Sequence, residues 1–340
     1  MTEPAPSPAP IPTTPEWFDQ VVEAVIDPEQ RIVDPHHHLW PVGGVLPYGL
    51  ADLTADVRSG HNVERTVFVE CSSAYRTDGP AHLWPLGETE FVTAEALRDP
   101  NRMIRGIVAH ADLTDTEHLD EVLDAHIELG QGLVRGIRDA GACDPHPESL
   151  TIPGPAPVGL YANPAFRAGV TRLGARGLTY DTWHYHHQNQ DFAALARAVP
   201  NTLMVLDHFG TPLGVGEYAG HRDEIFEQWR EDIIKIAQCD NVVAKLGGMA
   251  MPDNGFGWHT ADRPPSSDEF VAAQSRYYLH TIECFGPERC MFESNFPVDR
   301  FSLSYRVLFN ALKKIAAPFS PTERDAMFFG TATRVYRLDQ

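Results

Sequence analysis

Eight short apolar runs recur along this chain, and each is followed by a longer stretch with the hydrophobic period of a helix. Strands of a parallel sheet are buried on both faces and read as such runs, with a helix returning the chain between them. The pattern predicts an α/β protein with a (β/α)8 or TIM barrel, although a doubly wound open sheet would give similar spacing. The expected strands span 31–34, 65–71, 103–110, 133–138, 177–182, 203–207, 241–246 and 290–294.

Helix signals lie between these runs. The segment Thr114-Asp-Thr-Glu117 is typical of a capping box and predicts a helix that ends at Gly130, with an apolar face made of Leu119, Val122, Leu123 and Ile127. A second helix is expected over 224–238. Two more should open at Ser266-Ser-Asp-Glu269 and at Ser320-Pro-Thr-Glu323.

The domain organisation follows from composition. Residues 1–15 are rich in proline and small residues, which favour an extended tail, and 16–340 are expected to form a single barrel domain. Two long intervals, 139–162 and 247–265, follow the carboxyl ends of the fourth and seventh strands, where barrel enzymes build their active sites.

Charge and cysteine content exclude several classes of function. The 27 Lys and Arg residues against 47 Asp and Glu give a net charge of -20, which disfavours nucleic acid and anionic membranes as partners. The chain shows no apolar span and no signal peptide, and its five scattered cysteines indicate no disulfide framework, so we expect a cytoplasmic protein. The expected partner is a small-molecule substrate, and a homo-oligomer is left open.

Histidines follow three of the expected strands. His36 and His38 form a His-x-His pair whose side chains alternate to one side of the first strand, and His208 ends the sixth. His184 and His186 follow the fifth strand and are expected near the substrate. A chance polar loop or a core histidine would explain any one of these alone, but histidines at several strand ends of one barrel indicate a site for a metal ion or a substrate.

Four segments in this order resemble the amidohydrolase superfamily, specifically the amidohydrolase-2 group of lactonase-like proteins: Asp34–Trp40, Leu206–Gly210, Cys290–Asp299 and Phe329–Leu338. Members of that group hydrolyse lactones of sugar acids and of intermediates of aromatic degradation. Related enzymes decarboxylate aromatic acids with a zinc ion. The resemblance implies that His36, His38 and His208 are catalytic and hold a divalent metal, zinc above all.

Asn295 departs from the family pattern. The family usually ends its eighth strand in Gly-Ser-Asp-Trp-Pro, whereas this chain reads Glu293-Ser-Asn-Phe-Pro297. An amide binds zinc poorly and is not a useful base near pH 7, so we expect the metal to be weakly bound or absent. Asn295 would then hold water or substrate by hydrogen bonds.

Other carboxylates could replace the missing base. Asp299, in the loop after the eighth strand, is the first choice, and Glu70, at the end of the second strand, is the next, near the substrate. Glu293 and Asp207 lie close in sequence, but the side of the strand to which each points is left open.

Two arginines and a lysine complete the set. Arg138, or else Arg135, in the fourth strand is expected to bind a substrate carboxylate through its planar guanidinium group. Lys245 lies in an apolar strand and needs a buried partner or the open barrel mouth, and its role is left open between structure and function.

The sequence therefore predicts a hydrolase that opens a lactone of a small carboxylated or sugar-acid substrate with activated water. The chain contains no nucleotide-binding glycine motif and no G-x-S-x-G nucleophile motif. The alternatives are a metal-dependent decarboxylase of an aromatic acid and a catalytically silent barrel that binds a small acid.

Overall fold

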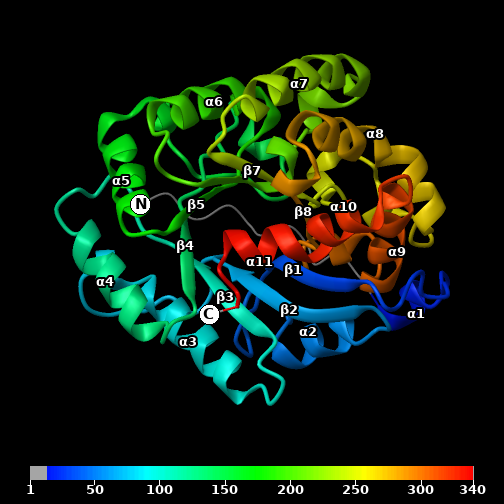
Figure 1. Cartoon of the computed structure of the whole chain (residues 1–340), viewed down its shortest axis with the longest axis horizontal. Coiled ribbons are helices and arrows are strands. Elements are labelled where there is room, and N and C mark those ends of the chain that lie inside the picture. Colours follow the sequence, from blue (N-terminus) through cyan, green and yellow to red (C-terminus); the bar gives the residue numbers. More distant parts are fainter. Residues whose placement is uncertain (1–13, 340) are drawn as a thin grey trace.

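The computed structural model describes residues 14–339 and shows eight parallel strands around a barrel, with helices between them (Figure 1). Each strand pairs with the next in sequence, which confirms the predicted (β/α)8 barrel. The first and last strands meet at a bridge between His37 and Phe296. The strands are β1 (Arg31–His37), β2 (Asn62–Val69), β3 (Ile104–Ala109), β4 (Val134–Arg138), β5 (Thr179–Thr182), β6 (Met204–Leu206), β7 (Val242–Leu246) and β8 (Cys290–Phe292).

Residues 1–13 of the expected tail lie outside the described residues, and Pro15 begins the first helix. The helices are α1 (Pro15–Phe18), α2 (Leu50–Val57), α3 (Leu86–Arg98), α4 (Leu119–Leu129), α5 (Pro164–Ala175), α6 (Asn189–Ala198), α7 (Arg222–Ala237), α8 (Ser267–Phe285), α9 (Tyr305–Ala316), α10 (Pro321–Asp325) and α11 (Thr331–Val335). Ser266 and Ser320 form the expected capping boxes of α8 and α10.

The start of α4 differs from the prediction. The helix begins at Leu119 because the Asp115 side chain accepts hydrogen bonds from the backbone N–H groups of Glu117 and His118, which holds the preceding residues in a turn. Ile127, which was predicted to lie on the apolar face, is 43% exposed, and His126 is buried on that face in its place.

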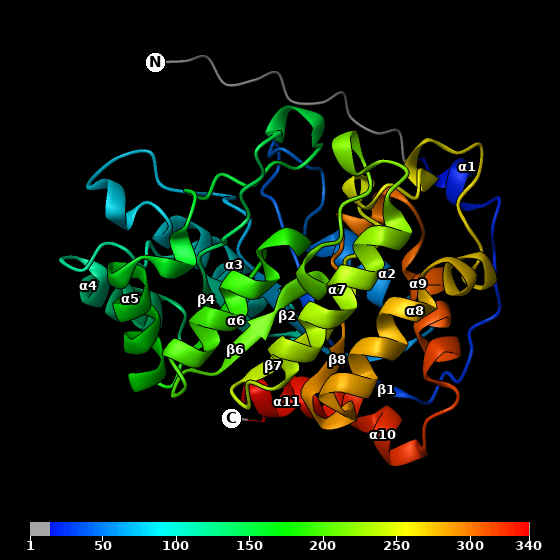
Figure 2. The same ribbon diagram turned by 90° about the horizontal axis from the view of Figure 1, so that it is seen from above.

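The C-terminal helices close the amino end of the barrel. Apolar side chains of α11 and its flanks pack against the inward side chains of six strands, in a cluster made of Val33, Val67, Val69, Val108, Val205, Val243, Met291, Phe329, Ala332, Val335, Tyr336 and Leu338. Figure 2 shows α11 in red at this end, with the long connections that follow β4 and β7 at the opposite end. The carboxyl ends of the strands are therefore left as the open mouth of the barrel.

The long connections at the mouth are the expected ones, after β4 and after β7. Each contains only short 3-10 turns, such as Pro147–Ser149 and Pro252–Asn254. Over 14–339, no helix combines the length and the apolar character that a bilayer crossing requires.

Candidate active site

The structure brings His36, His38 and His208 together at the carboxyl ends of β1 and β6. The ring centroids of His36 and His38 lie 4.9 Å apart, and those of His36 and His208 lie 4.6 Å apart. His37 points to the other side of β1 and packs against Phe68, as the alternation of a strand requires. The extension of β1 to His37, beyond the predicted end, places the His-x-His pair at the end of the strand, next to β8.

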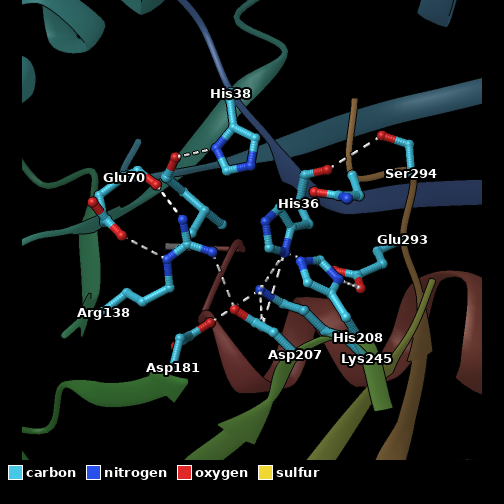
Figure 3. A network of polar contacts seen from close by, with 12 residues as sticks. His36, His38, Glu70, Arg138, Asp181, Asp207, His208, Lys245, Glu293 and Ser294 are labelled. Atoms are coloured by element: carbon cyan, nitrogen blue, oxygen red, sulfur yellow. Dashed lines mark hydrogen bonds and ion pairs between the residues drawn. The ribbon is translucent and has the colours of Figure 1, made fainter. Parts of the chain in front are cut away.

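One carboxylate holds two of these imidazoles. Glu293 Oε2 lies 2.8 Å from His36 Nδ1, and Glu293 Oε1 lies 2.7 Å from His208 Nδ1 (Figure 3). Since both contacts use Nδ1, the Nε2 atom of each ring is left for a ligand, and the buried Nε2 of His36 has no hydrogen-bond partner. Burial lowers the pKa of His208 to about 3 and that of His36 well below its usual value, so both imidazoles are neutral near pH 7. Burial also raises the pKa of Glu293, but Lys245 and the hydrogen bond from His208 oppose this shift, and a bound cation would favour the ionised carboxylate.

Two glycines at the end of β7 make room for this arrangement. A Cβ atom at Gly247 would lie 2.4 Å from Glu293 Cγ, and one at Gly248 would lie 2.0 Å from His208 Nδ1. Gly248 also has a φ of 68°, which side chains rarely adopt. The glycines that the sequence places after the seventh strand therefore allow close packing around Glu293 and His208.

Lys245 lies beneath the histidines and is fully buried. Its Nζ atom lies 3.0 Å from Asp181 Oδ2, 3.1 Å from Asp207 Oδ1 and 3.4 Å from His36 Nδ1. Tyr336, next to α11, donates a hydrogen bond from its hydroxyl group to Asp181. Despite the burial, these carboxylates raise the pKa of Lys245, which is therefore a cation in the floor of the site.

Arg138 forms the other cationic side of the network. Its Nε donates to Glu70 Oε1 at 2.7 Å, and Nη1 lies 3.5 Å from Asp207 Oδ2. Nη2 donates to the backbone oxygen of Glu70. Arg138 and Glu70 thus lie beside the histidines as expected, but the guanidinium group is already paired with two protein carboxylates.

The donor set fits a divalent cation. His36, Asp207 and His208 each offer a ligand atom, and these atoms lie within 4.8 Å of one another. In the surrounding network the carboxylates of Glu70, Asp181, Asp207 and Glu293 outnumber the cations Arg138 and Lys245, which favours an added positive charge. Imidazole and carboxylate are zinc ligands. The sequence analysis named His38 as the third metal ligand, whereas the group found in the structure has Asp207 as its third member.

His38 is held in a different way. Its Nδ1 lies 2.8 Å from the backbone oxygen of Val69, and a carbonyl oxygen only accepts hydrogen bonds. Nδ1 therefore carries the proton of the neutral ring, and Nε2 has a free lone pair.

Asn295 and Asp299 form a hydrogen bond near the bridge that joins His37 of β1 to Phe296. Asn295 Nδ2 donates to Asp299 Oδ1 at 2.9 Å, and the backbone N–H of Ala250 donates to Asp299 Oδ2. Asn295 Oδ1 is buried without a partner. Burial raises the pKa of Asp299 to about 8, so this carboxyl group is largely protonated at pH 7, whereas its expected role as a base requires the ionised form.

Three predicted site residues lie elsewhere. Arg135 is near the amino end of β4 and contacts Arg337. His184 is buried between Tyr161 and Asn189 of α6, and His186 accepts a hydrogen bond from the backbone N–H of Leu213. The chain turns after Thr182, the last residue of β5, so the alternation of side chains along the strand does not extend to His184 and His186.

Sequence reasoning missed Asp181 and Tyr336. Asp181 carries a weak signal, since a charged residue inside a buried strand needs a partner, as Lys245 does. Tyr336 carries no local signal, because it reaches the network only through the packing of α11 in the barrel.

Comparisons with known proteins agree with this architecture. The family model for amidohydrolases matches residues 33–338. An uncharacterized protein, y4mH, of Sinorhizobium fredii is 29% identical over 90% of this chain and 98% of its own length. L-fucono-1,5-lactonase of Burkholderia multivorans is 30% identical over 52% of this chain and 56% of its own length.

A crystal structure of an amidohydrolase from Burkholderia multivorans with bound zinc has the same fold. It superposes with a TM-score of 0.70 at 23% identity, covering 90% of this chain and 99% of that one. The family match extends from β1, which carries the His-x-His pair, to Leu338, which follows the helix that closes the barrel. This chain belongs to the amidohydrolase family.

Proposed function

We propose that this protein hydrolyses a lactone of a small, polar organic acid. The observation that carries the proposal is the Glu293 carboxylate, which holds His36 and His208 with both Nε2 atoms left for a ligand. The relative named L-fucono-1,5-lactonase supports a lactone as the substrate class, and the family match supports hydrolysis.

His36, Asp207 and His208 would hold a divalent cation, which supplies Lewis-acid activation of a carbonyl oxygen and of water when it is bound. Glu293 fixes the ring orientation of both histidines by accepting hydrogen bonds from Nδ1. Beneath them, the ammonium group of Lys245 partly offsets the charge of the surrounding carboxylates.

His38 is the imidazole that remains outside the cation-binding group. Its Nε2 lone pair is left free by the contact of Nδ1 with the Val69 carbonyl oxygen and accepts a proton from the attacking water. Burial and the nearby Arg138 hold the pKa of His38 well below its usual value, so the imidazolium readily returns the proton to the alkoxide that leaves when the ring opens.

Two further groups contact the substrate in this proposal. Asn295 Oδ1 accepts a hydrogen bond from the water or from a substrate hydroxyl group. Arg138 has more N–H donors than its protein contacts use, and the remaining ones stabilise the oxyanion or bind a substrate carboxylate.

A panel of sugar-acid lactones and aromatic lactones, assayed by acid release, tests the proposal. We expect at least one lactone to be hydrolysed, with kcat/KM falling by about 100-fold or more in His38→Ala and His208→Ala. His118→Ala is the matched control, because His118 pairs with Asp115 on the surface. Release of CO2 from hydroxybenzoates without lactone hydrolysis would support a decarboxylase instead. Binding of small acids without either reaction would support a silent barrel.

A further inference from the structure

The amino end of the barrel, opposite the mouth, carries a group of arginines that the proposed function does not use. Each of the first four strands has an arginine within its first four residues, and two more lie in α11 and just after it, giving the set Arg31, Arg65, Arg105, Arg135, Arg334 and Arg337. In a chain with a net charge of -20, such a concentration of cations on one face needs an explanation.

Two members of this set have carboxylate partners, and a third donates to a carbonyl oxygen outside the set. Arg31 pairs with Glu64, Arg65 pairs with Asp339, and Arg334 donates to the backbone oxygen of Glu288. Among residues 14–339, by contrast, no carboxylate lies within ion-pair distance of Arg105, Arg135 or Arg337.

Arg135 is the most unusual member because it is 8% exposed and almost unpartnered. Its Nε is buried without a hydrogen bond, and Nη1 makes only a 3.4 Å contact with the neighbouring backbone oxygen of Val134. Of the other buried cations among the described residues, Arg138 and Lys245 each contact two carboxylates, and Lys313 donates to the backbone oxygens of Ile26 and Asp27. A buried cation without a counter-charge is costly, so the position of Arg135 calls for an anion.

Like charges surround Arg135. Arg337 Nη2 lies 3.4 Å from the backbone oxygen of Arg135, and the Arg135 side chain passes Gly106, next to Arg105. Burial, Arg337 and Arg105 lower the pKa of Arg135, which agrees with an uncompensated charge. Arg337 also lines a surface depression of about 500 Å³, which is shared with Arg31, Arg334 and two acidic residues, Asp325 and Asp339. A small anion can approach Arg337 from there.

We propose that Arg105, Arg135 and Arg337 form a binding site for a small tetrahedral oxyanion, such as inorganic phosphate, at the closed end of the barrel. Guanidinium groups bind such oxyanions through paired N–H donors, and three neighbouring arginines are suited to a multiply charged one. The ligand ties the start of β3 and β4 to the segment that follows α11, so its binding stabilises the closure of the barrel.

Thermal unfolding of the full chain, with phosphate compared against chloride at equal ionic strength, tests the site. We expect phosphate to raise the Tm of the wild type, and calorimetry to show binding that is at least about tenfold weaker in Arg135→Met. Without phosphate, Arg135→Met should be at least as stable as the wild type, because it removes a buried cation that lacks a partner. Arg263→Met is the matched control, since Arg263 pairs with Glu269 on the surface.

Two further variants keep the test decisive. If Arg135→Met fails to fold, Arg105→Gln and Arg337→Gln, which alter partly exposed side chains, should each weaken phosphate binding. An equal response of wild type and Arg135→Met to phosphate would overturn the proposal.

Discussion

At the scale of single residues, the site depends on where β8 places its acidic group. Glu293 and Asn295 lie two residues apart, and the carboxylate that contacts His36 and His208 comes from the first of them. The sequence analysis identified the loss of charge at Asn295 but left the direction of Glu293 open, because a shift of one residue reverses the side to which a strand residue points. Only the structure shows that Glu293 faces the histidines.

Glu293→Gln tests this role. The amide has the same shape but donates from one of its two terminal atoms, so it cannot accept from Nδ1 of both histidines at once. We expect kcat/KM and the affinity for zinc to fall by about 10- to 100-fold, with little change in Tm. Enzyme assays and equilibrium dialysis measure the two effects, with Glu64→Gln on the surface as the control. Unchanged zinc affinity would show that Glu293 does not orient ligands.

Asn295→Asp gives a second prediction. The new carboxylate would face Asp299 at 2.9 Å, and two carboxylates at this distance must share a proton. We expect a loss of about 2 kcal/mol or more of unfolding free energy at pH 8 and a smaller loss at pH 5.5. The double variant Asn295→Asp/Asp299→Asn exchanges the two groups and should recover most of the stability, as urea unfolding at both pH values would show. Equal losses in the single and double variants would exclude carboxylate repulsion as the cause.

At the scale of elements, the strands and four of the helices were predictable, since buried strands and capping boxes have local patterns. The helix after the third strand was predicted to begin four residues too early, because Thr114 and Glu117 matched a capping box while Asp115 formed the turn instead. The positions of His184 and His186 were not predictable, because they depend on how the chain turns after β5. The contribution of α11 to the site had no local signal either.

Tyr336→Phe tests whether the segment at the end of α11 contributes to the site. The substitution removes the hydrogen bond to Asp181 but keeps the ring, whose centroid lies 5.5 Å from Lys245 Nζ. We expect kcat to fall about tenfold with little change in KM, because Asp181 and Lys245 lose their fixed position below the histidines. Tyr278→Phe is the control, since the buried hydroxyl group of Tyr278 has no partner. An equal kcat in both variants would limit Tyr336 to a packing role.

At the scale of the whole molecule, buried ionisable groups control the dependence of stability on pH. Burial lowers the pKa of many histidines, to about 4 for His61, His126, His184 and His186. These groups take up protons in the unfolded chain first, so stability is lost as the pH falls below 6.5 and through 4. Burial also raises the pKa of Glu88 and Asp299 to about 8, so their contribution is lost as the pH rises from 4 through 8.

The two sets of groups together predict that the protein is most stable at about pH 6 to 7. Chemical unfolding from pH 4.5 to 9 measures this profile. Asp299→Asn should reduce the decline on the alkaline side and steepen the rise between pH 4.5 and 6, because it removes one of the raised carboxyl groups whose contribution is lost from pH 4 through 8. A wild-type profile that rises continuously to pH 9 would contradict the assignment.

The closure of the barrel by α11 also has a consequence for synthesis. All eight strands leave the ribosome before α11 does, and until then the inward valines of β1, β2 and β3 lack the side chains that cover them. Asp181 also lacks its hydrogen bond until Tyr336 has been translated, 155 residues later. We therefore expect the nascent chain to expose the apolar floor of the barrel, and to lack the hydrogen bond that fixes Asp181, until α11 docks.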